Sequence, residues 1–151
     1  MKVKTSELSG IALDYAVAVC EGGSDFCFDG ITWGFNLSGN VKVLAKGWAQ
    51  SMSYCPSSDW YTGGPIIESN KIDTFWDSGN ECWDASMDKG MFVESGPTPL
   101  IAAMRCFVAS KFGDEIDVPE ELLLGWKQYD IDNLKRENKK LKKELELLKN
   151  D

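Results

Sequence analysis

An apolar heptad repeat near the C-terminus constrains the fold of this chain more than any other feature of its sequence. Apolar residues and one asparagine recur there at alternating intervals of three and four residues. They are Ile131, Leu134, Asn138, Leu141, Leu145 and Leu148. Ile131, Asn138 and Leu145 take heptad position a, and the other three take position d. A stripe this narrow predicts a helix that packs against a second, similar helix.

The charges beside this stripe predict how two such helices pair. Acidic residues occupy position g and lysines position e, namely Asp130, Glu137 and Glu144, and Lys135, Lys142 and Lys149. In a parallel pair each acid faces a lysine of the other chain, whereas an antiparallel pair brings like charges together. Asn138 at an a position also favours two strands in a fixed register. We therefore expect a parallel homodimer through residues 130–149, the alternative being a single exposed helix.

The residues before this tail form a separate, acidic part of the chain. Residues 1–124 carry 8 basic and 18 acidic residues, a net charge of −10, and residues 125–151 carry a net charge of +2. We expect a globular domain at 1–124 and a coiled-coil dimerisation tail at 125–151, with the boundary near Gly125. An acidic body repels nucleic acid, so direct nucleic-acid binding is not expected.

Composition also argues against membrane, metal and disulfide classes. No apolar run approaches the roughly 20 residues that span a bilayer, and the first residues lack the apolar centre of a signal peptide. The five cysteines are scattered, and the chain contains no histidine. We therefore expect a cytoplasmic protein without a metal, a cofactor or a disulfide framework. The acidic residues between Asp73 and Asp88 lack calcium-loop spacing and are interpreted as a solvated face.

Hydrophobic periodicity predicts an α+β domain with two main helices and a small antiparallel sheet of four or five strands. The helices are expected over 6–21, capped by Thr5 or Ser6, and from Pro99 to Gly113, capped by Thr98. A further short helix begins at Pro119. The segments with strand patterning, from which the four or five strands of this sheet would come, are 26–28, 31–35, 41–46, 66–67, 72–76 and 81–87. Asp29-Gly30 is the expected hairpin turn, and the aromatic and apolar residues around it are expected to share a buried face.

Tyr54 to Ile67 has neither helical nor strand periodicity, and we interpret it as an ordered loop and candidate ligand site. Gly63 and Gly64 can turn backbone N–H groups toward a phosphate or carboxylate, and Trp60 and Tyr61 can stack on a base. The full candidate set is Asp59, Trp60, Tyr61, Gly63, Gly64, Pro65 and Arg105, where Asp59 would accept from ribose hydroxyls and Arg105, Lys42 or Lys71 would supply counter-charge. The alternative is that Trp60 and Pro65 only pin the loop onto the core.

Several blocks of the first 124 residues together form a specific pattern, namely Met1–Leu8, Ala12–Val17, Cys20–Gly22, Ser57–Trp60, Gly63–Glu68, Thr98–Cys106, Gly113–Glu115 and Val118–Leu122. With these blocks the chain resembles the NinX-type proteins of tailed bacteriophages. The resemblance implies a phage origin and the cytoplasm of the infected host as the location. It implies no reaction, because the family is one of unknown function. Residues 25–46 and the tail depart from the family pattern.

Three classes of function are consistent with these features. The first is a small-ligand-binding protein that sequesters a nucleotide-derived signal of host antiviral defence at the Tyr54 to Ile67 segment. The second is an acidic interaction protein that binds and inhibits a host protein. The third is a phage accessory enzyme, which is less favoured because no pairing of nucleophile and base is visible in the sequence, and no catalytic residue is assigned.

Overall fold

A computed structural model describes residues 1–44 and 50–149, with the side chains of residues 1–44, 50–123 and 135–148. The chain forms two compact units, Met1–Val118 and Pro119–Asp151. Over these described residues, the first unit contains three α-helices and nine strands, and the second contains one long helix. The predicted α+β class is confirmed. The boundary expected at Gly125 lies inside that long helix.

Three helices organise the first unit: α1 (Gly10–Cys20), α2 (Trp60–Asn70) and α3 (Pro99–Phe112). α3 is the central element, because most of its side chains are buried and it contacts both other helices and the strands β7 and β8. Its predicted start is confirmed, since the Thr98 side chain accepts a hydrogen bond from the Ile101 N–H and Pro99 occupies the first turn. α1 begins later than predicted, at Gly10, because Thr5–Glu7 forms a separate 3-10 turn, η1.

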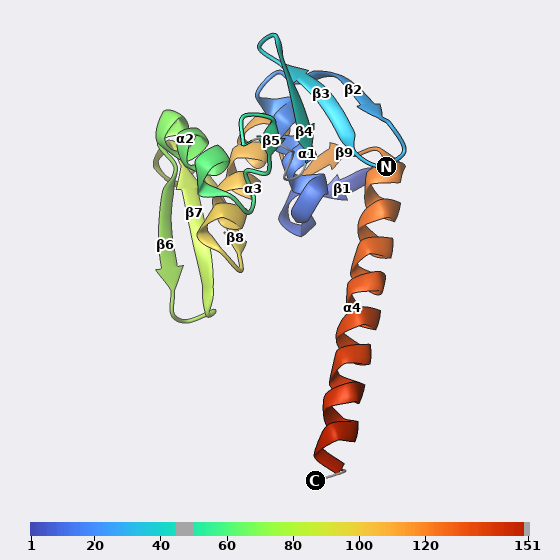
Figure 1. The fold of residues 1–151 in the computed structure, drawn as a ribbon. Coiled ribbons are helices and arrows are strands. Elements are labelled where there is room, and N and C mark those ends of the chain that lie inside the picture. The colour runs from blue at the N-terminus through green and yellow to red at the C-terminus, as the bar shows by residue number, and fades with distance from the viewer. Residues whose placement is uncertain (45–49, 150–151) are drawn as a thin grey trace. The chain divides into compact units, whose positions relative to one another are not determined.

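The strands divide into three small sheets rather than the single sheet expected. The two-stranded sheet pairs β1 (Lys2–Lys4) with β9 (Glu115–Asp117). The four-stranded sheet contains β2 (Ser24–Phe28), β3 (Trp33–Leu37), β4 (Asn40–Leu44) and the short parallel strand β5 (Ser53–Tyr54). The three-stranded antiparallel sheet contains β6 (Asp73–Asp77), β7 (Cys82–Met87) and β8 (Phe92–Gly96), with the 3-10 turn η2 (Asp88–Gly90) between β7 and β8. Figure 1 shows α1 and α3 between the two larger sheets.

The hairpin predicted at Asp29-Gly30 is present, but its residues do not all share a buried face. Asp29 accepts hydrogen bonds from the N–H groups of Ile31 and Thr32, so Ile31 lies in the connection and is 87% exposed. Phe28 is also exposed, whereas Phe35 is buried and stacks on Phe26. The turn bonds therefore remove Ile31 from the strand alternation on which the prediction rested.

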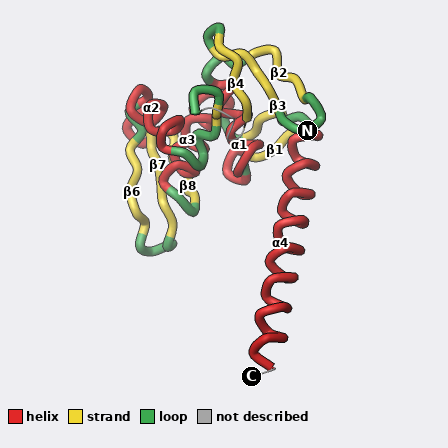
Figure 2. Tube along the Cα trace, in the orientation of Figure 1, coloured by secondary structure: helices red, strands yellow, loops and turns green. Residues whose placement is uncertain are grey.

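The second unit is a single helix, α4 (Glu120–Lys149), drawn as the long coil in Figure 2. The short helix predicted at Pro119 therefore does not end at Gly125 but continues through it. Leu141, Leu145 and Leu148 of the heptad stripe are exposed in the single chain. The side chains of Ile131 and Leu134 lie outside the described residues, as do Ala45 and Lys46 at the end of one predicted strand. In the described part of the chain, no helix is long and apolar enough to cross a membrane.

Candidate functional site

The segment from Tyr54 to Ile67 is not the predicted loop but a strand end, a turn and the first part of a helix. Tyr54 ends β5, and α2 begins at Trp60. Asp59 is the N-cap of α2, because its carboxylate accepts a hydrogen bond from the Tyr61 N–H at 3.0 Å. The predicted strand at Ile66 and Ile67 is therefore also wrong. Two glycines and a proline mark a loop by local propensity, and tertiary packing overrides that propensity here.

The packing that favours a helix here is the close contact of Gly63 with Pro56 and Leu100. A Cβ atom on Gly63 would lie 2.4 Å from the Pro56 carbonyl oxygen and 2.7 Å from Leu100 Cδ2. Only a residue without a side chain lets α2 approach the preceding turn and the start of α3 this closely. The N–H of Gly63 bonds the Asp59 carbonyl inside the helix at 2.8 Å. The anion-binding nest predicted from Gly63 and Gly64 is therefore not formed.

Two side chains, Asp14 of α1 and Glu21 at the C-terminal end of α1, hold the segment in front of α2. Asp14 is 5% exposed and its carboxylate accepts a hydrogen bond from the Ser57 N–H at 2.8 Å. Burial raises the pKa of Asp14 to about 7, against the lowering effect of its bonds from Ser57. The Tyr54 hydroxyl donates to Glu21 at 2.5 Å. Sequence reasoning assigned no role to Asp14 or Glu21, and no sequence pattern marks contacts between residues this far apart.

Trp60 and Tyr61 are the aromatic candidate residues, and the structure leaves both available to a partner. They are 56% and 61% exposed, respectively, at the first turn of α2. Pro65 lies inside α2 and is exposed, and Gly64 is packed less closely than Gly63, since a Cβ there would meet only the Trp60 ring at 3.9 Å. The segment therefore presents an aromatic pair on a helix rather than a polar cradle.

Arg105 is committed to the fold. Its Nε donates to the Leu8 carbonyl at 2.8 Å and its Nη1 donates to the Ser95 carbonyl at 2.7 Å. These bonds tie α3 to the segment before α1 and to β8, rather than to the first turn of α2. Lys42, also predicted as counter-charge, donates to the Ser51 carbonyl at 2.5 Å, and Lys71 is the left-handed C-cap residue of α2.

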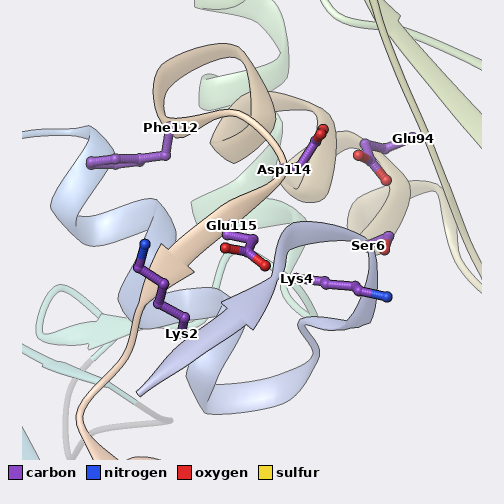
Figure 3. Close-up of a pocket in the computed structure, with 7 residues that line it drawn as sticks. All are labelled: Lys2, Lys4, Ser6, Glu94, Phe112, Asp114 and Glu115. Carbon is purple, nitrogen blue, oxygen red and sulfur yellow. The ribbon is translucent and has the colours of Figure 1, made fainter.

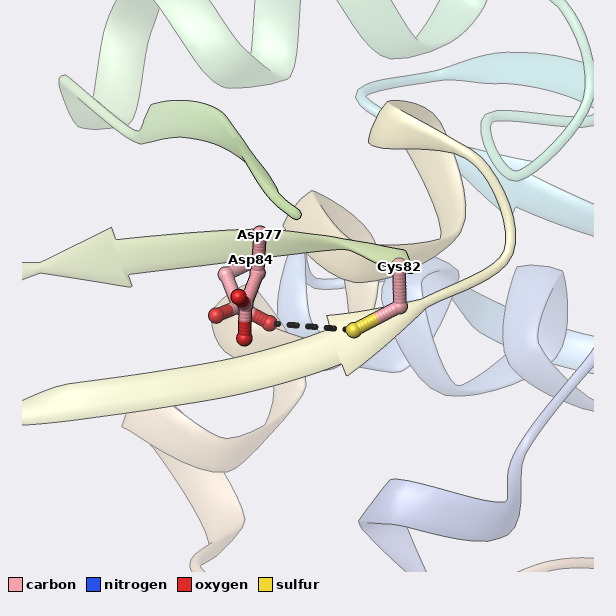
Figure 4. A group of neighbouring side chains, drawn as sticks. All are labelled: Asp77, Cys82 and Asp84. Carbon is pink, nitrogen blue, oxygen red and sulfur yellow. Dashed lines mark hydrogen bonds between the residues drawn. The ribbon is translucent and has the colours of Figure 1, made fainter. Parts of the chain in front are cut away.

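One cluster of side chains on the β6–β7 hairpin has the composition of a cation site. The ligand atoms of Asp77, Cys82 and Asp84 lie within 4.8 Å of one another (Figure 4). The Asp77 carboxylate already accepts hydrogen bonds from the N–H groups of Gly79 and Asn80 and from the Asn80 amide. Asp84 accepts from Ser95 Oγ at 2.6 Å and from the Cys82 thiol. Hydrogen bonds within the sheet and its turn thus explain why these three side chains lie close together, without a bound cation.

A cavity of about 700 Å³ lies beside the β1–β9 pair. Its lining residues are Lys2, Lys4, Ser6, Glu94, Phe112, Asp114 and Glu115. Figure 3 shows Glu94, Asp114 and Ser6 on one side of β9 and Lys2 and Phe112 on the other. Desolvation raises the pKa of Glu94, while Arg105 opposes this shift. Because cationic and anionic groups alternate around it, the cavity favours no single class of ligand.

Comparison with known proteins matches most of the first unit to a protein family. The family model described as "Bacteriophage P22, NinX" matches residues 4–111. The match includes α1, α2, most of α3 and the three-stranded sheet, and it ends before α4. No curated protein matches the chain. The match extends over well more than half of the chain and confirms the resemblance seen in the sequence.

Proposed function

This chain belongs to the NinX family of bacteriophage proteins, and we propose that it is an acidic, non-enzymatic interaction protein that binds and inhibits a protein of the infected host. It acts in the host cytoplasm as a parallel homodimer joined through residues 130–149. In this proposal the first unit is the binding body and α4 is the dimerising element.

The observation that carries this proposal is the exposure of Trp60 and Tyr61 in the first turn of α2. Trp and Tyr are the residues most enriched at the energetic centres of protein interfaces, because they bury a large area and lose little conformational freedom. Here both rings project from the first turn of α2, which Asp59, Gly63 and Pro56 hold in place. An aromatic pair that is preorganised in this way favours contact with a protein surface.

The polar groups around this pair argue against a small nucleotide as the ligand. Asp59 already caps α2, the two glycines direct no N–H cradle, and Arg105 bonds two backbone carbonyls. A nucleotide would therefore find stacking surfaces without the phosphate and ribose contacts that the sequestration hypothesis requires. Nucleotide sequestration is therefore the alternative that the experiment below must be able to detect.

The raised pKa values of three cysteine thiols argue against the enzyme hypothesis. Burial raises the pKa of Cys20 and Cys106 to about 12, and the pKa of Cys82 is also raised. A thiol with a raised pKa supplies little thiolate at neutral pH and is a poor nucleophile. We therefore propose binding rather than catalysis.

The charge of the body indicates what kind of partner it attracts. Residues 1–124 carry a net charge of −10. A field of this sign accelerates association with a basic protein and slows association with nucleic acid and acidic proteins. We propose that the inhibited host protein is basic and that the acidic body occludes its functional surface.

The exposed leucines of α4 support the dimer. Leu141 and Leu145 are each 55% exposed and Leu148 is 75% exposed in the single chain. Exposed leucines at heptad spacing favour a second helix as their cover. Two joined bodies bind a partner with two sites more tightly than one body does.

Affinity capture from infected cells tests this function. The full chain, carrying a tag, is recovered beside a variant with Trp60→Ala and Tyr61→Ala and a control with Phe112→Ala, another exposed aromatic residue. We expect one basic host protein at fixed stoichiometry with the native chain and the control, and its loss with the double variant. A nucleotide released on heating the native chain, with no host protein present, would instead support sequestration.

A further inference from the structure

The three-stranded sheet has one face covered by α3 and one face open. The covered face is identified by Ala85 and Met87, which are buried, and by Gly96, where a Cβ atom would lie 2.8 Å from the Ala102 nitrogen in α3. Side chains alternate between the two faces along each strand. Asp84 and Ser86 of β7 therefore belong to the open face.

The strand register extends this open face over β6. Asp73 pairs with Ser86, Phe75 with Asp84, and Asp77 with Cys82. The side chains of Asp73, Phe75 and Asp77 consequently project from the same face as Asp84. Phe75 is 46% exposed. The outer strand thus presents an acid, an aromatic ring and a second acid at alternate positions.

Among the side chains that the structure describes, these carboxylates have no cationic partner. In the described part of the chain, no lysine or arginine forms an ion pair with Asp73, Asp77 or Asp84. The hydrogen bonds that Asp77 and Asp84 accept come from neutral groups. The negative charge of the open face is therefore uncompensated and available to a cation from outside.

The edges of β2 and β8 carry the features that protect sheet edges. The β2 strand has a register shift between Ser24 and Cys27, a bulge that interrupts further pairing. At β8, the Ser95 carbonyl accepts from Arg105 and the Phe92 carbonyl accepts from the Cys106 thiol. Both edges are thus poor templates for another strand.

The edge of β6 carries neither kind of protection. Among the residues that the structure describes, β6 pairs only with β7, and no side chain bonds to its backbone. It contains no lysine, proline or bulge within Asp73–Asp77. An edge strand of this length offers unpaired N–H and C=O groups to an incoming strand.

We propose that the β6 edge accepts an extended cationic segment of a partner protein as an added strand. Basic side chains two residues on either side of an apolar one would face Asp73 and Asp77, with the apolar side chain beside Phe75. A second copy of this chain is a poor occupant, because antiparallel pairing of two β6 strands sets Asp73 opposite Asp77. The surface shares no residue with the Trp60 and Tyr61 pair. The inference rests on the proposed function only in that the ligand is a protein.

A peptide-binding measurement on the full chain tests this inference. The probe is a synthetic peptide with the central sequence Arg-Thr-Val-Thr-Arg, followed by fluorescence anisotropy and by the backbone amide resonances of the protein. We expect micromolar binding, weakening as salt is raised, with the largest shifts at residues 73–77. Binding that shifts no amide of β6, or an absence of binding, would overturn the inference.

Two matched controls separate strand addition from general attraction of charge. The pair Asp73→Asn and Asp77→Asn should weaken binding by about fivefold or more, while Asp25→Asn with Glu7→Gln, outside this sheet, should change it by less than about twofold. A peptide with the same side chains and an N-methylated backbone should fail to bind, because it cannot pair. Equal weakening by both acid pairs, or full binding of the methylated peptide, contradicts the proposal.

The result is independent of the capture experiment. A captured host protein, together with a peptide that fails to pair at β6, leaves the proposed function standing and overturns this surface. Peptide pairing at β6 without any captured host protein supports this surface and overturns the proposed function.

Discussion

The carboxylate of Asp14 in α1 accepts a hydrogen bond from the backbone N–H of Ser57, 43 residues further along the chain, at 2.8 Å. Both residues are buried. This bond fixes the turn that precedes α2, and the raised pKa of Asp14, about 7, follows from its burial. The position of the Trp60 helix thus depends on a carboxyl group that titrates near neutral pH.

The stability of the first unit should therefore depend on the protonation of Asp14. Because the folded-state pKa lies above the ordinary value of 3.8, the folded state holds a proton that the unfolded state has released. The stabilising contribution of this proton is complete below about pH 4 and is lost as pH rises toward about 7, by roughly 4 kcal/mol. Urea unfolding at a series of pH values measures this loss.

Asp14→Asn provides the control for that titration, because the amide oxygen can still accept from Ser57. We expect the difference in unfolding free energy between the Asp14→Asn variant and the native protein to change with pH over the same interval. A difference that is constant with pH would contradict the assignment. Asp29 and Asp77, whose pKa values are lowered by turn hydrogen bonds, affect both proteins equally.

Gly63 and Gly64 make a matched pair for testing the packing of α2. Gly63→Ala places a methyl group 2.4 Å from the Pro56 carbonyl oxygen and should destabilise the first unit by about 2 kcal/mol or more. Gly64→Ala meets only the Trp60 ring at 3.9 Å and should be neutral or stabilising by up to about 1 kcal/mol. Thermal unfolding of both variants measures the contrast, and equal effects would contradict the described approach of α2 to Pro56.

The contrast between α3 and α2 shows how far the sequence could predict this fold. α3 was predictable because its cap, its first-turn proline and its terminating Gly113 act locally. α2 was not, because Gly63, Gly64 and Pro65 disfavour a helix locally and only contacts with Pro56 and Leu100 favour it. The β1–β9 pair was missed for the same reason, since these two strands pair with each other although they are distant in the sequence.

The binding role of the aromatic residues stays a prediction, whereas the polar residues of the candidate site have structural partners that the sequence did not reveal. Trp60 and Tyr61 lie in an exposed position, as a binding role requires. The roles of Asp59 and Arg105 are set by the Tyr61 N–H and by the carbonyls of Leu8 and Ser95. Those partners follow from tertiary structure, and residue type alone does not reveal them.

Truncation of the aromatic pair should leave the fold intact. Because both rings are more than half exposed, Trp60→Ala with Tyr61→Ala should change the unfolding free energy by less than about 1 kcal/mol. Circular dichroism during thermal unfolding measures this. A large loss of stability would mean that the rings serve the fold, which is the alternative to a binding role.

The heptad stripe of α4 predicts two distinct effects of substitution. Leu141→Glu places a charge in the seam and should convert the dimer to a monomer at micromolar concentration. Asn138→Ile removes the polar residue that favours two strands and should yield a tighter assembly with trimers or larger species. Sedimentation measures both. A native chain that is monomeric at micromolar concentration would contradict the predicted dimer.

Native mass spectrometry of the protein purified from infected cells tests the central claim most directly. We predict a complex that contains two copies of this chain and a fixed number of copies of one basic host protein, and we predict its absence for Trp60→Ala with Tyr61→Ala. A dimer that carries only a small molecule, displaced in the same double variant, would contradict the proposed function.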